Sequence, residues 1–471
     1  MAKDATLPEV SVSQRFARWA LGLEAAAIPD AVRAAAASSA LDVAGLCASA
    51  RSLDYVAAVR DSWDAEGPCT AIGHGRAMDA AGAAFVNGTA AHGEDYDDTF
   101  EGTPVHTGAV MVPAVLAVCE RFGLSGADAL RGLSGADALR GLAAGTELMC
   151  RMALVAPTAV HRAGFHPTAV IGAMGAAAGC GVALRLDERQ LTDALGIAGS
   201  MASGIIEYLA EGSWTKRIHA GWAAQSGLRA ALLARQGFLG PRTVIEGHHG
   251  FFFAFADHGI APDYAQLTDG LGETWHAATV AFKPYACGTM TQPFIDCAVR
   301  LARDGLDIAR IASISCDVGE GTVHRLWEPL SEKRAPSTAY SAKFSVPFCV
   351  AVGLVDRAAG LGQFTDARIA DPAVLDLAAK VSYVIDPADE YPRNYSGHVR
   401  VTLTDGQTVE ARQPHMRGGA REPLGLDELE AKFRANCAFG GWDAARAGTL
   451  RDFCAGLFDA PDLAGLGAFR G

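Results

Sequence analysis

The sequence lacks the features that mark several large classes of protein. Its 471 residues carry a formal net charge of −13 and no stripe of lysine or arginine, which argues against a nucleic-acid binder. It contains no GxxxxGK[ST] phosphate loop and no GxSxG nucleophile elbow. The metal-ligand spacings HxH, HExxH and DxDxDG are also absent, so none of the common zinc or calcium motifs is available.

Cysteine motifs and membrane signals are missing as well. The 11 cysteines form no CxxC pair and stand singly among apolar residues, which is typical of buried thiols and not of an iron–sulfur site. The N-terminus carries charges where a signal peptide needs an apolar core. The longest uncharged run, Pro167 to Leu184, is rich in alanine and glycine and predicts a tightly packed interior helix. We therefore expect a soluble, cytoplasmic protein without membrane contact.

Apolar residues at spacings of three and four predict helices over most of the first 265 residues. The clearest are Gln14–Leu23, Pro29–Leu46, Ala80–Ala91, Gly108–Phe122, Leu139–Met152, Thr168–Leu184, Glu188–Ala202 and Ala220–Gln236.

Alternation and β-branched residues appear only after about residue 272. They predict strands at Thr279–Tyr285, Ile311–Val318, Lys380–Ile385, His398–Thr404 and Gln407–Gln413, the last two joined by an Asp405-Gly406 hairpin turn. Further helices are expected between and after them, at Gln292–Arg303, Pro347–Ala359, Ala373–Ala379, Leu426–Asn436 and Trp442–Leu457. The predicted architecture is mainly α: an all-helical domain (residues 1–272 and 414–471) with an inserted α+β domain (273–413). A ligand is expected in the cleft between two such domains.

A nine-residue tandem repeat, GLSGADALR, occupies positions 123–131 and 132–140. Nine residues turn a helix by about 900°, so the two copies cannot present the same face to one core. We expect the second copy to start a helix, and the first to form a loop or a short extra turn without a function.

The stretch HGEDYDDTFEGTPVH holds four carboxylates, Glu94, Asp95, Asp97 and Asp98, between His92 and His106. Taken alone, this cluster is compatible with a solvated turn, a metal site or an acid/base pair.

Several cationic or titratable residues stand just before predicted helix N-termini. They are His106, His166, the pair Lys216 and His219, and Lys283. Helix N-termini offer unpaired N–H groups and a positive dipole end, which suits a ligand with several negative charges. The residues alone predict a site for a small anionic molecule.

The same residues resemble the MmgE/PrpD family, which includes 2-methylcitrate dehydratase, cis-aconitate decarboxylase and iminodisuccinate epimerase. The similar segments follow the family's order along nearly the whole chain: NGTAAHGEDYDDTF with VHTGAV, GFHPTAVIGAMGAAA, GSWTKRIHAG, FKPYACGTMTQPFID, SAKFSVPF and NYSGHVRVTLTDG. The resemblance implies a helical domain formed by both chain ends, an inserted lid domain, a homodimer, and no metal or organic cofactor.

The resemblance also carries the family's active-site positions onto this chain. They correspond to Asp95, Asp97, Asp98, Thr99, His106, His166, Lys216 with His219, and Lys283. Two departures stand out: Arg217 takes the place of the family's usual proline, and Pro347 lies near the position where the aconitate decarboxylases have a tyrosine. The second departure argues against a decarboxylase.

All three family reactions form a carbanion or enediolate beside a carboxylate, which cations and helix N-termini stabilise. We expect His106 to act as acid or base, Asp95 to orient it, and His166 to donate to the anion. Lys216 and Lys283 would clamp substrate carboxylates, with Thr99, His219 and Asp98 also binding substrate. The leading prediction is a cofactor-independent hydro-lyase acting on a 2-methylcitrate-like acid. Decarboxylation of an aconitate, epimerisation of an imino dicarboxylate, and carboxylate binding without turnover remain alternatives.

Overall fold

The computed structural model describes residues 8–101, 103, 105–123 and 133–471. The chain divides into two compact units. Unit 1 comprises Met1–Gly93, Asp97–Val280 and Asn436–Gly471, and unit 2 comprises Glu94–Tyr96 and Ala281–Ala435. This division records which residues pack together. The boundaries expected from the sequence, at 272/273 and 413/414, stay a prediction about independent domains.

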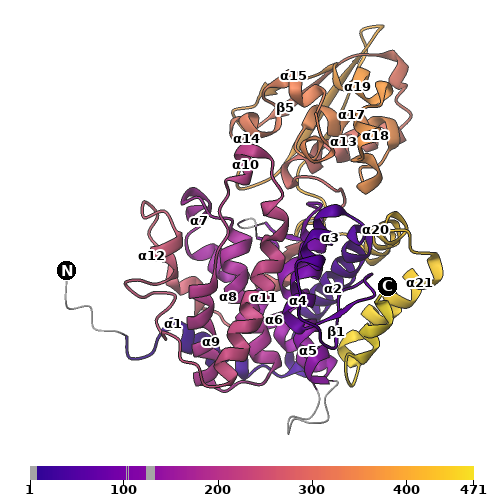
Figure 1. The fold of residues 1–471 in the computed structure, drawn as a ribbon. Coiled ribbons are helices and arrows are strands. Elements are labelled where there is room, and N and C mark those ends of the chain that lie inside the picture. The colour runs from indigo at the N-terminus through magenta and orange to yellow at the C-terminus, as the bar shows by residue number, and fades with distance from the viewer. Residues whose placement is uncertain (1–7, 102, 104, 124–132) are drawn as a thin grey trace. The chain divides into compact units, whose positions relative to one another are not determined.

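Unit 1 is built from helices, shown in indigo to magenta with α21 in yellow in Figure 1. Its helices are α1 (Val12–Leu21), α2 (Asp30–Ala50), α3 (Asp54–Asp61), α4 (Ala80–His92), α5 (Gly108–Gly123), α6 (Gly135–Val155), α7 (Ala159–Arg162), α8 (Pro167–Ala183), α9 (Glu188–Met201), α10 (Tyr208–Glu211), α11 (Thr215–Arg235), α12 (Phe251–Phe255) and α21 (Ala444–Ala455). Three two-residue strands, β1 (Cys69–Thr70), β2 (Ala77–Met78) and β3 (Thr99–Phe100), complete it.

Helix α8 forms the centre of unit 1, as its alanine- and glycine-rich sequence predicts. All its residues from Thr168 to Ala183 are buried. Helix α11 packs closely against both α8 and α4, and small residues permit this. At Gly221 of α11 a Cβ atom would lie 2.2 Å from the carbonyl oxygen of Phe85 in α4. Only glycine allows so close an approach without displacing the backbone.

The long helices predicted in the first 265 residues are confirmed, with one consequential shift. Helix α11 begins at Thr215, five residues before the expected start at Ala220. Only Ile218 is apolar among the first five residues, TKRIH, so the apolar periodicity that signalled the helix starts only at Ala220. Lys216 and His219 therefore lie inside the helix, three residues apart and on one face, and not before it.

The second copy of the tandem repeat starts α6, as expected. The backbone N–H of Ser134 donates to Asp137 Oδ2 at 3.0 Å, which links the N-cap residue to the third position of the helix. The first copy lies almost entirely outside the described residues, so the loop expected there stays a prediction.

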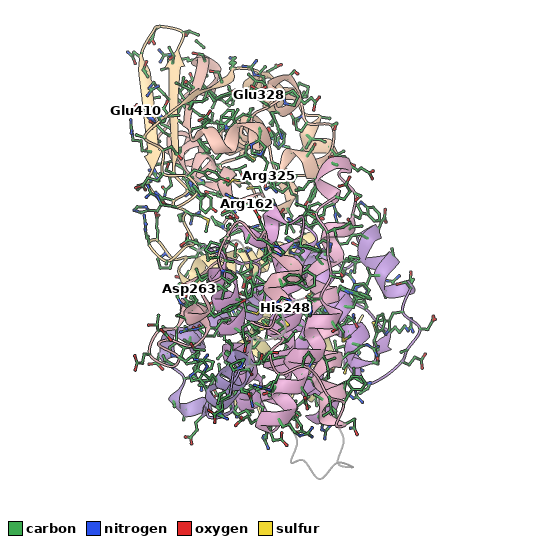
Figure 2. All side chains as sticks on the ribbon, turned by 90° about the vertical axis from the view of Figure 1, so that its left-hand side faces the viewer. Arg162, His248, Asp263, Arg325, Glu328 and Glu410 are labelled. Carbon is green, nitrogen blue, oxygen red and sulfur yellow. The ribbon has the colours of Figure 1, made fainter. Side chains whose placement is uncertain are left out.

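Unit 2 contains a four-stranded sheet in the order β6-β5-β7-β8. The strands are β5 (Ile311–Val318), β6 (Val381–Ile385), β7 (Gly397–Leu403) and β8 (Thr408–Gln413). Strands β5 and β6 run parallel, whereas β5 with β7 and β7 with β8 run antiparallel. Strand β8, on which Figure 2 marks Glu410, is the second strand of the predicted hairpin. The turn residue Gly406 has φ 84°. The hairpin prediction is confirmed.

The helices contained in unit 2 are α13 (Gln292–Arg303), α14 (Glu320–Leu326), α15 (Leu330–Arg334), α16 (Ala339–Ala342), α17 (Val346–Asp356), α18 (Asp366–Ile369) and α19 (Pro372–Ala378). Helix α13 precedes β5 in the sequence, and the others lie between β5 and β6. Strand β4 (Val280–Ala281) and helix α20 (Leu426–Phe439) each contain a unit boundary. The strand expected at Thr279–Tyr285 is only these two residues long, since Pro284 has no N–H for a ladder. The fold is thus mainly α with an α+β part.

Two further expectations concern burial. All 11 cysteines are free and buried, in agreement with isolated apolar thiols. Among the described helices, α2 alone is long and apolar enough to cross a membrane, yet 56% of that window is buried within the protein. This burial is ordinary for a core helix of a soluble protein.

Candidate active site

Helix ends in unit 1 bring four histidines together. His92 is the last residue of α4, His106 lies two residues before α5, and His166 is the N-cap of α8, followed by Pro167. His219 lies in the second turn of α11. The C-terminus of α4 and the N-terminal parts of α5, α8 and α11 therefore supply the site. We refer to His92, His106, His166 and His219 as the histidine cluster.

The four imidazoles are buried and in mutual contact. Ring centroids lie 5.0 Å apart for His92 and His106, 5.6 Å for His92 and His166, and 5.1 Å for His166 and His219. Each histidine is at most 7% exposed. His106, His166 and His219 were predicted as site residues, and the structure brings them together. His92 was considered only as a metal ligand, because a histidine ending an alanine-rich helix carries no catalytic signature.

Asp97 is the carboxylate of the histidine cluster. Its Oδ2 lies 2.7 Å from His92 Nδ1 and 3.6 Å from His106 Nδ1, and the side chain is fully buried. Its carboxylate therefore lies within reach of both rings. The sequence-based expectation that Asp95 orients His106 stays a prediction, because Asp95 belongs to unit 2. Within unit 1, the carboxylate beside His106 is that of Asp97.

A backbone hydrogen bond fixes the orientation of His106. Its Nδ1 lies 2.6 Å from the carbonyl oxygen of Asp98, and a carbonyl only accepts. Nδ1 therefore carries the proton, and Nε2 is the nitrogen that exchanges a proton with a ligand. This is the geometry of a general acid or base held by a neighbouring acceptor.

His166 and His219 form a neutral pair. Their Nδ1 atoms lie 3.0 Å apart, so one donates and the other accepts. Burial, with the charges of His219, His92 and Lys216 next, holds the pKa of His166 well below its ordinary value. Burial also lowers the pKa of His219 to about 3. At neutral pH both rings are uncharged, and the ring whose Nδ1 accepts offers its Nε2–H to a ligand without adding positive charge.

Asp98 caps helix α5. Both carboxylate oxygens accept from the backbone N–H of Gly108 at 2.9 Å, and Thr107 Oγ1 donates to Oδ2 at 3.2 Å. A Cβ atom at position 108 would lie 2.6 Å from Asp98 Oδ2, so this capping contact requires glycine. Burial, opposed by the Gly108 N–H, raises the pKa of Asp98 to about 7. These contacts occupy the carboxylate that we expected to bind substrate.

Thr99 and Lys216, two predicted substrate-binding residues of unit 1, are both buried. Thr99, in β3, has a hydroxyl oxygen without a hydrogen-bond partner among the described residues. Lys216, in the first turn of α11, is 8% exposed, and its charge contributes to the lowered pKa of both His166 and His219. A buried cation and a buried hydroxyl suit an oxyanion ligand. The neighbouring Arg217 places its guanidinium 4.3 Å from the Tyr55 ring centroid.

The remaining acidic residues of the cluster belong to unit 2 and pair with lysines there. Lys283 Nζ donates at 2.8 Å to both the carbonyl oxygen and Oδ1 of Asp95, and Lys283 is fully buried. Lys343 Nζ donates at 2.6 Å to Glu94. Each lysine therefore forms an ion pair with a carboxylate of unit 2. The ion pair between Lys343 and Glu94 was not predicted from the sequence.

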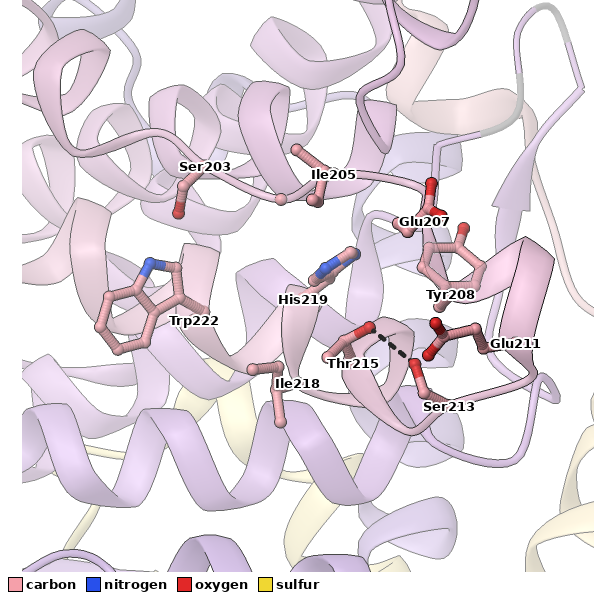
Figure 3. A pocket seen from close by; sticks show the side chains of 11 residues that line it. Ser203, Ile205, Glu207, Tyr208, Glu211, Ser213, Thr215, Ile218, His219 and Trp222 are labelled. Carbon is pink, nitrogen blue, oxygen red and sulfur yellow. Dashed lines mark hydrogen bonds between the residues drawn. The ribbon is translucent and has the colours of Figure 1, made fainter.

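A pocket of about 630 Å³ borders the histidine cluster in unit 1. Figure 3 shows His219 lying between Trp222 and Tyr208 in its lining. The ring of Tyr208 is edge-on to His219 at 5.7 Å and to His166 at 6.1 Å. No motif marked this tyrosine in the sequence, because only the fold of α10 against α11 brings its phenol to the histidines.

The residues His92, Asp97 and His106 also satisfy the distance requirement for a metal site, with ligand atoms within 4.8 Å of one another. The Nδ1 atoms of His92 and His106 face Asp97 Oδ2 and the Asp98 carbonyl, so an ion at this place would be bound through the Nε2 atoms of both rings. The same Nε2 atoms are the ones available for proton transfer.

Buried histidines, a carboxylate, a lysine and helix N-termini around a pocket make this a candidate active site. Comparison with known proteins identifies the family. The MmgE/PrpD N-terminal domain matches residues 14–261 and the MmgE/PrpD C-terminal domain matches residues 285–449. The chain belongs to the MmgE/PrpD family.

Curated relatives extend the comparison over nearly the full chain. A cis-aconitate decarboxylase of Aspergillus terreus is 29% identical over 97% of this chain and 95% of its own length. The cis-aconitate decarboxylase of Homo sapiens is 30% identical over 78% of this chain and 74% of its own. Together with the family match, these relatives indicate an enzyme with a lyase-type reaction.

Proposed function

We propose that the protein is a lyase that decarboxylates cis-aconitate or a closely related unsaturated tricarboxylate, without a metal or organic cofactor. The observation that carries this proposal is the full-length similarity to proteins named cis-aconitate decarboxylase. The sequence-based expectation favoured dehydration of a 2-methylcitrate-like acid, with decarboxylation as an alternative. The relatives support the alternative and give no specific support to a hydro-lyase.

The reaction replaces one carboxylate by a proton. The bond between carbon and the departing carboxylate breaks, CO₂ leaves, and the electron pair remains on the substrate, delocalised towards a retained carboxylate. One proton then adds to carbon, so that a tricarboxylate becomes a dicarboxylate. The enzyme must therefore stabilise a developing enediolate and supply one proton.

His106 is the proposed proton donor. Nδ1 is fixed by the Asp98 carbonyl, so the mobile proton is on Nε2 in the imidazolium form. Asp97, 3.6 Å from Nδ1, stabilises that cation before the proton is transferred. The ring returns to the cationic form by taking a proton from water after product leaves.

The proposed carboxylate-binding groups are Lys216, the His166–His219 pair and Thr99. Neutral imidazoles suit this role because they donate an N–H without the cost of burying further positive charge. Lys283 remains a proposed carboxylate-binding residue from the family resemblance, although it is paired with Asp95 within unit 2.

Pro347 lies near the position where the aconitate decarboxylases have a tyrosine, and the local structure at this position suits proline. Pro347 stands in the first turn of α17, directly after the N-cap Ser345 and Val346, where proline is well tolerated. Position 347 thus supplies no phenol, and the described phenol beside the histidine cluster is that of Tyr208. We propose that Tyr208 takes part in binding the substrate carboxylates.

The reaction is tested by NMR of the purified protein in D₂O with cis-aconitate, 2-methylcitrate and an imino dicarboxylate in parallel. The proposal predicts a dicarboxylate product with deuterium on carbon, together with CO₂, from cis-aconitate alone. Loss of water from 2-methylcitrate would instead support the hydro-lyase, and configurational exchange would support an epimerase. Saturable binding of cis-aconitate without any product would support a binding protein.

We also propose that the protein is a cytoplasmic homodimer without nucleic-acid partners. Exposed large apolar side chains gather in the segment that borders the pocket, at Ile205, Leu209, Trp214 and Trp222. Exposed large apolar side chains that lie close together in the sequence occur at protein–protein interfaces. Light scattering after size-exclusion chromatography tests the proposal, and a monomer at micromolar concentration would contradict it.

A further inference from the structure

A second pocket in unit 1 is rich in arginine. It has a volume of about 510 Å³ and lies where the end of α2, the helix α3 and the β1–β2 loop meet. It shares no lining residue with the pocket beside the histidine cluster. Its lining consists of Arg51, Ser52, Arg60, Asp61, Gly73, His74, Gly75 and Arg76. We propose that this pocket binds a small dianionic oxyanion, either a phosphate group or a dicarboxylate.

The charge of the lining suits a dianion. Three arginines face a single carboxylate, which leaves two formal positive charges in a chain of net charge −13. Arg60 pairs with Asp61 at 2.7 and 2.8 Å. Arg51 and Arg76 have no carboxylate within ion-pair distance among the residues that the structure describes. Two guanidinium groups are thus available to an anion, and their planar forks match the oxygens of phosphate and carboxylate.

Arg51 is held in place by the backbone. Its Nε donates to the carbonyl oxygen of Gly440 at 2.7 Å, which fixes the plane of the guanidinium while leaving its two terminal nitrogens for other acceptors. A positioned guanidinium loses less conformational entropy when it binds an anion than a fully mobile one.

His74 adds a donor of defined tautomer. Its Nδ1 lies 3.4 Å from Nη1 of Arg60, and because a guanidinium only donates, Nδ1 must accept. The neutral ring therefore carries its proton on Nε2. That nitrogen is buried and has no hydrogen-bond partner among the described residues. An unpaired buried N–H is costly, and an oxyanion between the arginines would supply an acceptor.

The protonation state of His74 is consistent with this role. Burial, followed by the charges of Arg60 and Arg51, lowers its pKa to about 4. The ring is thus neutral at physiological pH, and the Nε2–H is a donor under all ordinary conditions.

The loop that carries His74 is fixed at both ends. Strands β1 and β2 pair Cys69 with Met78 and Thr70 with Ala77. The N–H of Gly73, a residue with φ 80°, donates to the carbonyl oxygen of Phe469 at 2.8 Å. The pocket is therefore built before any ligand arrives, as expected of a binding site and not of a chance gathering of side chains.

Isothermal titration of the full-length protein with inorganic phosphate and, separately, with succinate tests the proposal. The variant is Arg76→Gln, a lining residue whose side chain makes no hydrogen bond or ion pair with the residues that the structure describes. The matched control is Arg303→Gln, an exposed arginine at the end of α13. We expect at least one anion to bind the wild type and the control alike, and about tenfold or more weaker binding to Arg76→Gln.

A second variant, His74→Phe, tests the buried donor and should also weaken binding. Binding of phosphate alone identifies a phosphate site, and binding of succinate alone identifies a dicarboxylate site. Two results overturn the proposal. One is that neither anion binds at millimolar concentration. The other is that binding is unchanged in both Arg76→Gln and His74→Phe, because the anion would then occupy another site.

Discussion

At the scale of single residues, Asp95 and Asp97 stand two positions apart and serve different partners. Asp95 has φ 58°, in the left-handed region that few residues adopt. It pairs with Lys283, whereas Asp97 contacts the rings of His92 and His106. No pattern in EDYDDT reveals this reversal, since it depends on one backbone angle. The sequence could therefore predict that carboxylates serve the site but not which of them does.

Substitution of Asp97 by asparagine should act on proton transfer. Loss of the carboxylate charge removes the electrostatic stabilisation of the His106 imidazolium. Because the proposed acid is active only while protonated, the high-pH limb of the kcat profile should move to lower pH. The profile of Asp97→Asn against wild type checks this, and an unshifted limb would contradict the role of Asp97.

Asp95→Asn is the matched variant and should behave differently. It leaves the fully buried Lys283 without its carboxylate, and breaking such a pair costs about 3–5 kcal/mol of stability. We expect a lower denaturation midpoint and a kcat profile with unmoved limbs. If Asp95→Asn moved the high-pH limb and Asp97→Asn did not, the original assignment of Asp95 would be restored.

Removal of divalent metal ions should leave activity unchanged. The proposed mechanism assigns proton transfer to His106 and carboxylate binding to Lys216 and the His166–His219 pair, so it requires no ion. Activity of the EDTA-dialysed protein, measured before and after addition of zinc, manganese or iron(II), checks this. A loss on dialysis that one metal restores would make His92, Asp97 and His106 ligands.

At the scale of secondary-structure elements, close helix packing depends on glycine. Gly221→Ala would place a Cβ atom 2.2 Å from the Phe85 carbonyl and force α11 away from α4. We expect a loss of about 1–3 kcal/mol in the free energy of unfolding, together with reduced activity, because Lys216 and His219 belong to α11.

The control for this variant is Gly448→Ala in α21. Apart from the neighbouring residues and backbone of α21 itself, no described atom lies within 4 Å of the added methyl group, so the variant should gain about 0.5–1 kcal/mol from helix propensity alone. Chemical denaturation of both variants measures the difference, and equal effects would show that the α4–α11 approach is not tight.

The start of α5 makes stability depend on pH through Asp98. A pKa of about 7 in the folded protein, against an ordinary 3.8, means that the folded state binds this proton more tightly than the unfolded chain. The free energy of unfolding should therefore fall as pH rises between these values, by at most about 1.4 kcal/mol per pH unit, and level off above pH 7.

Asp98→Asn isolates this contribution, since an amide oxygen still accepts from Gly108 but does not titrate. Denaturation at several pH values should show a shallower decline for the variant than for wild type. Parallel curves for the two proteins would show that Asp98 does not titrate in this range.

Sequence periodicity located the long helices, yet it placed the start of α11 too late. The residues that matter to the site, Lys216 and His219, lie in the turn that the apolar pattern does not reach. Helix ends are set by polar contacts and by tertiary packing, neither of which leaves a periodic signal. For the same reason the apolar pattern did not indicate that His92, the last residue of α4, lies at the site.

At the scale of the whole molecule, the sequence predicted a mainly helical fold with an α+β part, and this is confirmed. The hairpin of β7 and β8 was readable because its turn is local. The parallel pairing of β5 with β6 was not, because these strands are more than sixty positions apart and their register depends on non-local packing. Tyr208 reaches the histidine cluster only through such packing.

The most direct test of the account is the decarboxylation rate of cis-aconitate by wild type, His106→Ala and the exposed control His324→Ala. We predict that His106→Ala lowers kcat by about 100-fold or more, the scale of a general acid, while His324→Ala retains the wild-type rate. Folding of each variant is checked by its denaturation midpoint. Full activity in a folded His106→Ala protein would contradict the assignment of His106, and no turnover of cis-aconitate by wild type would contradict the proposed reaction.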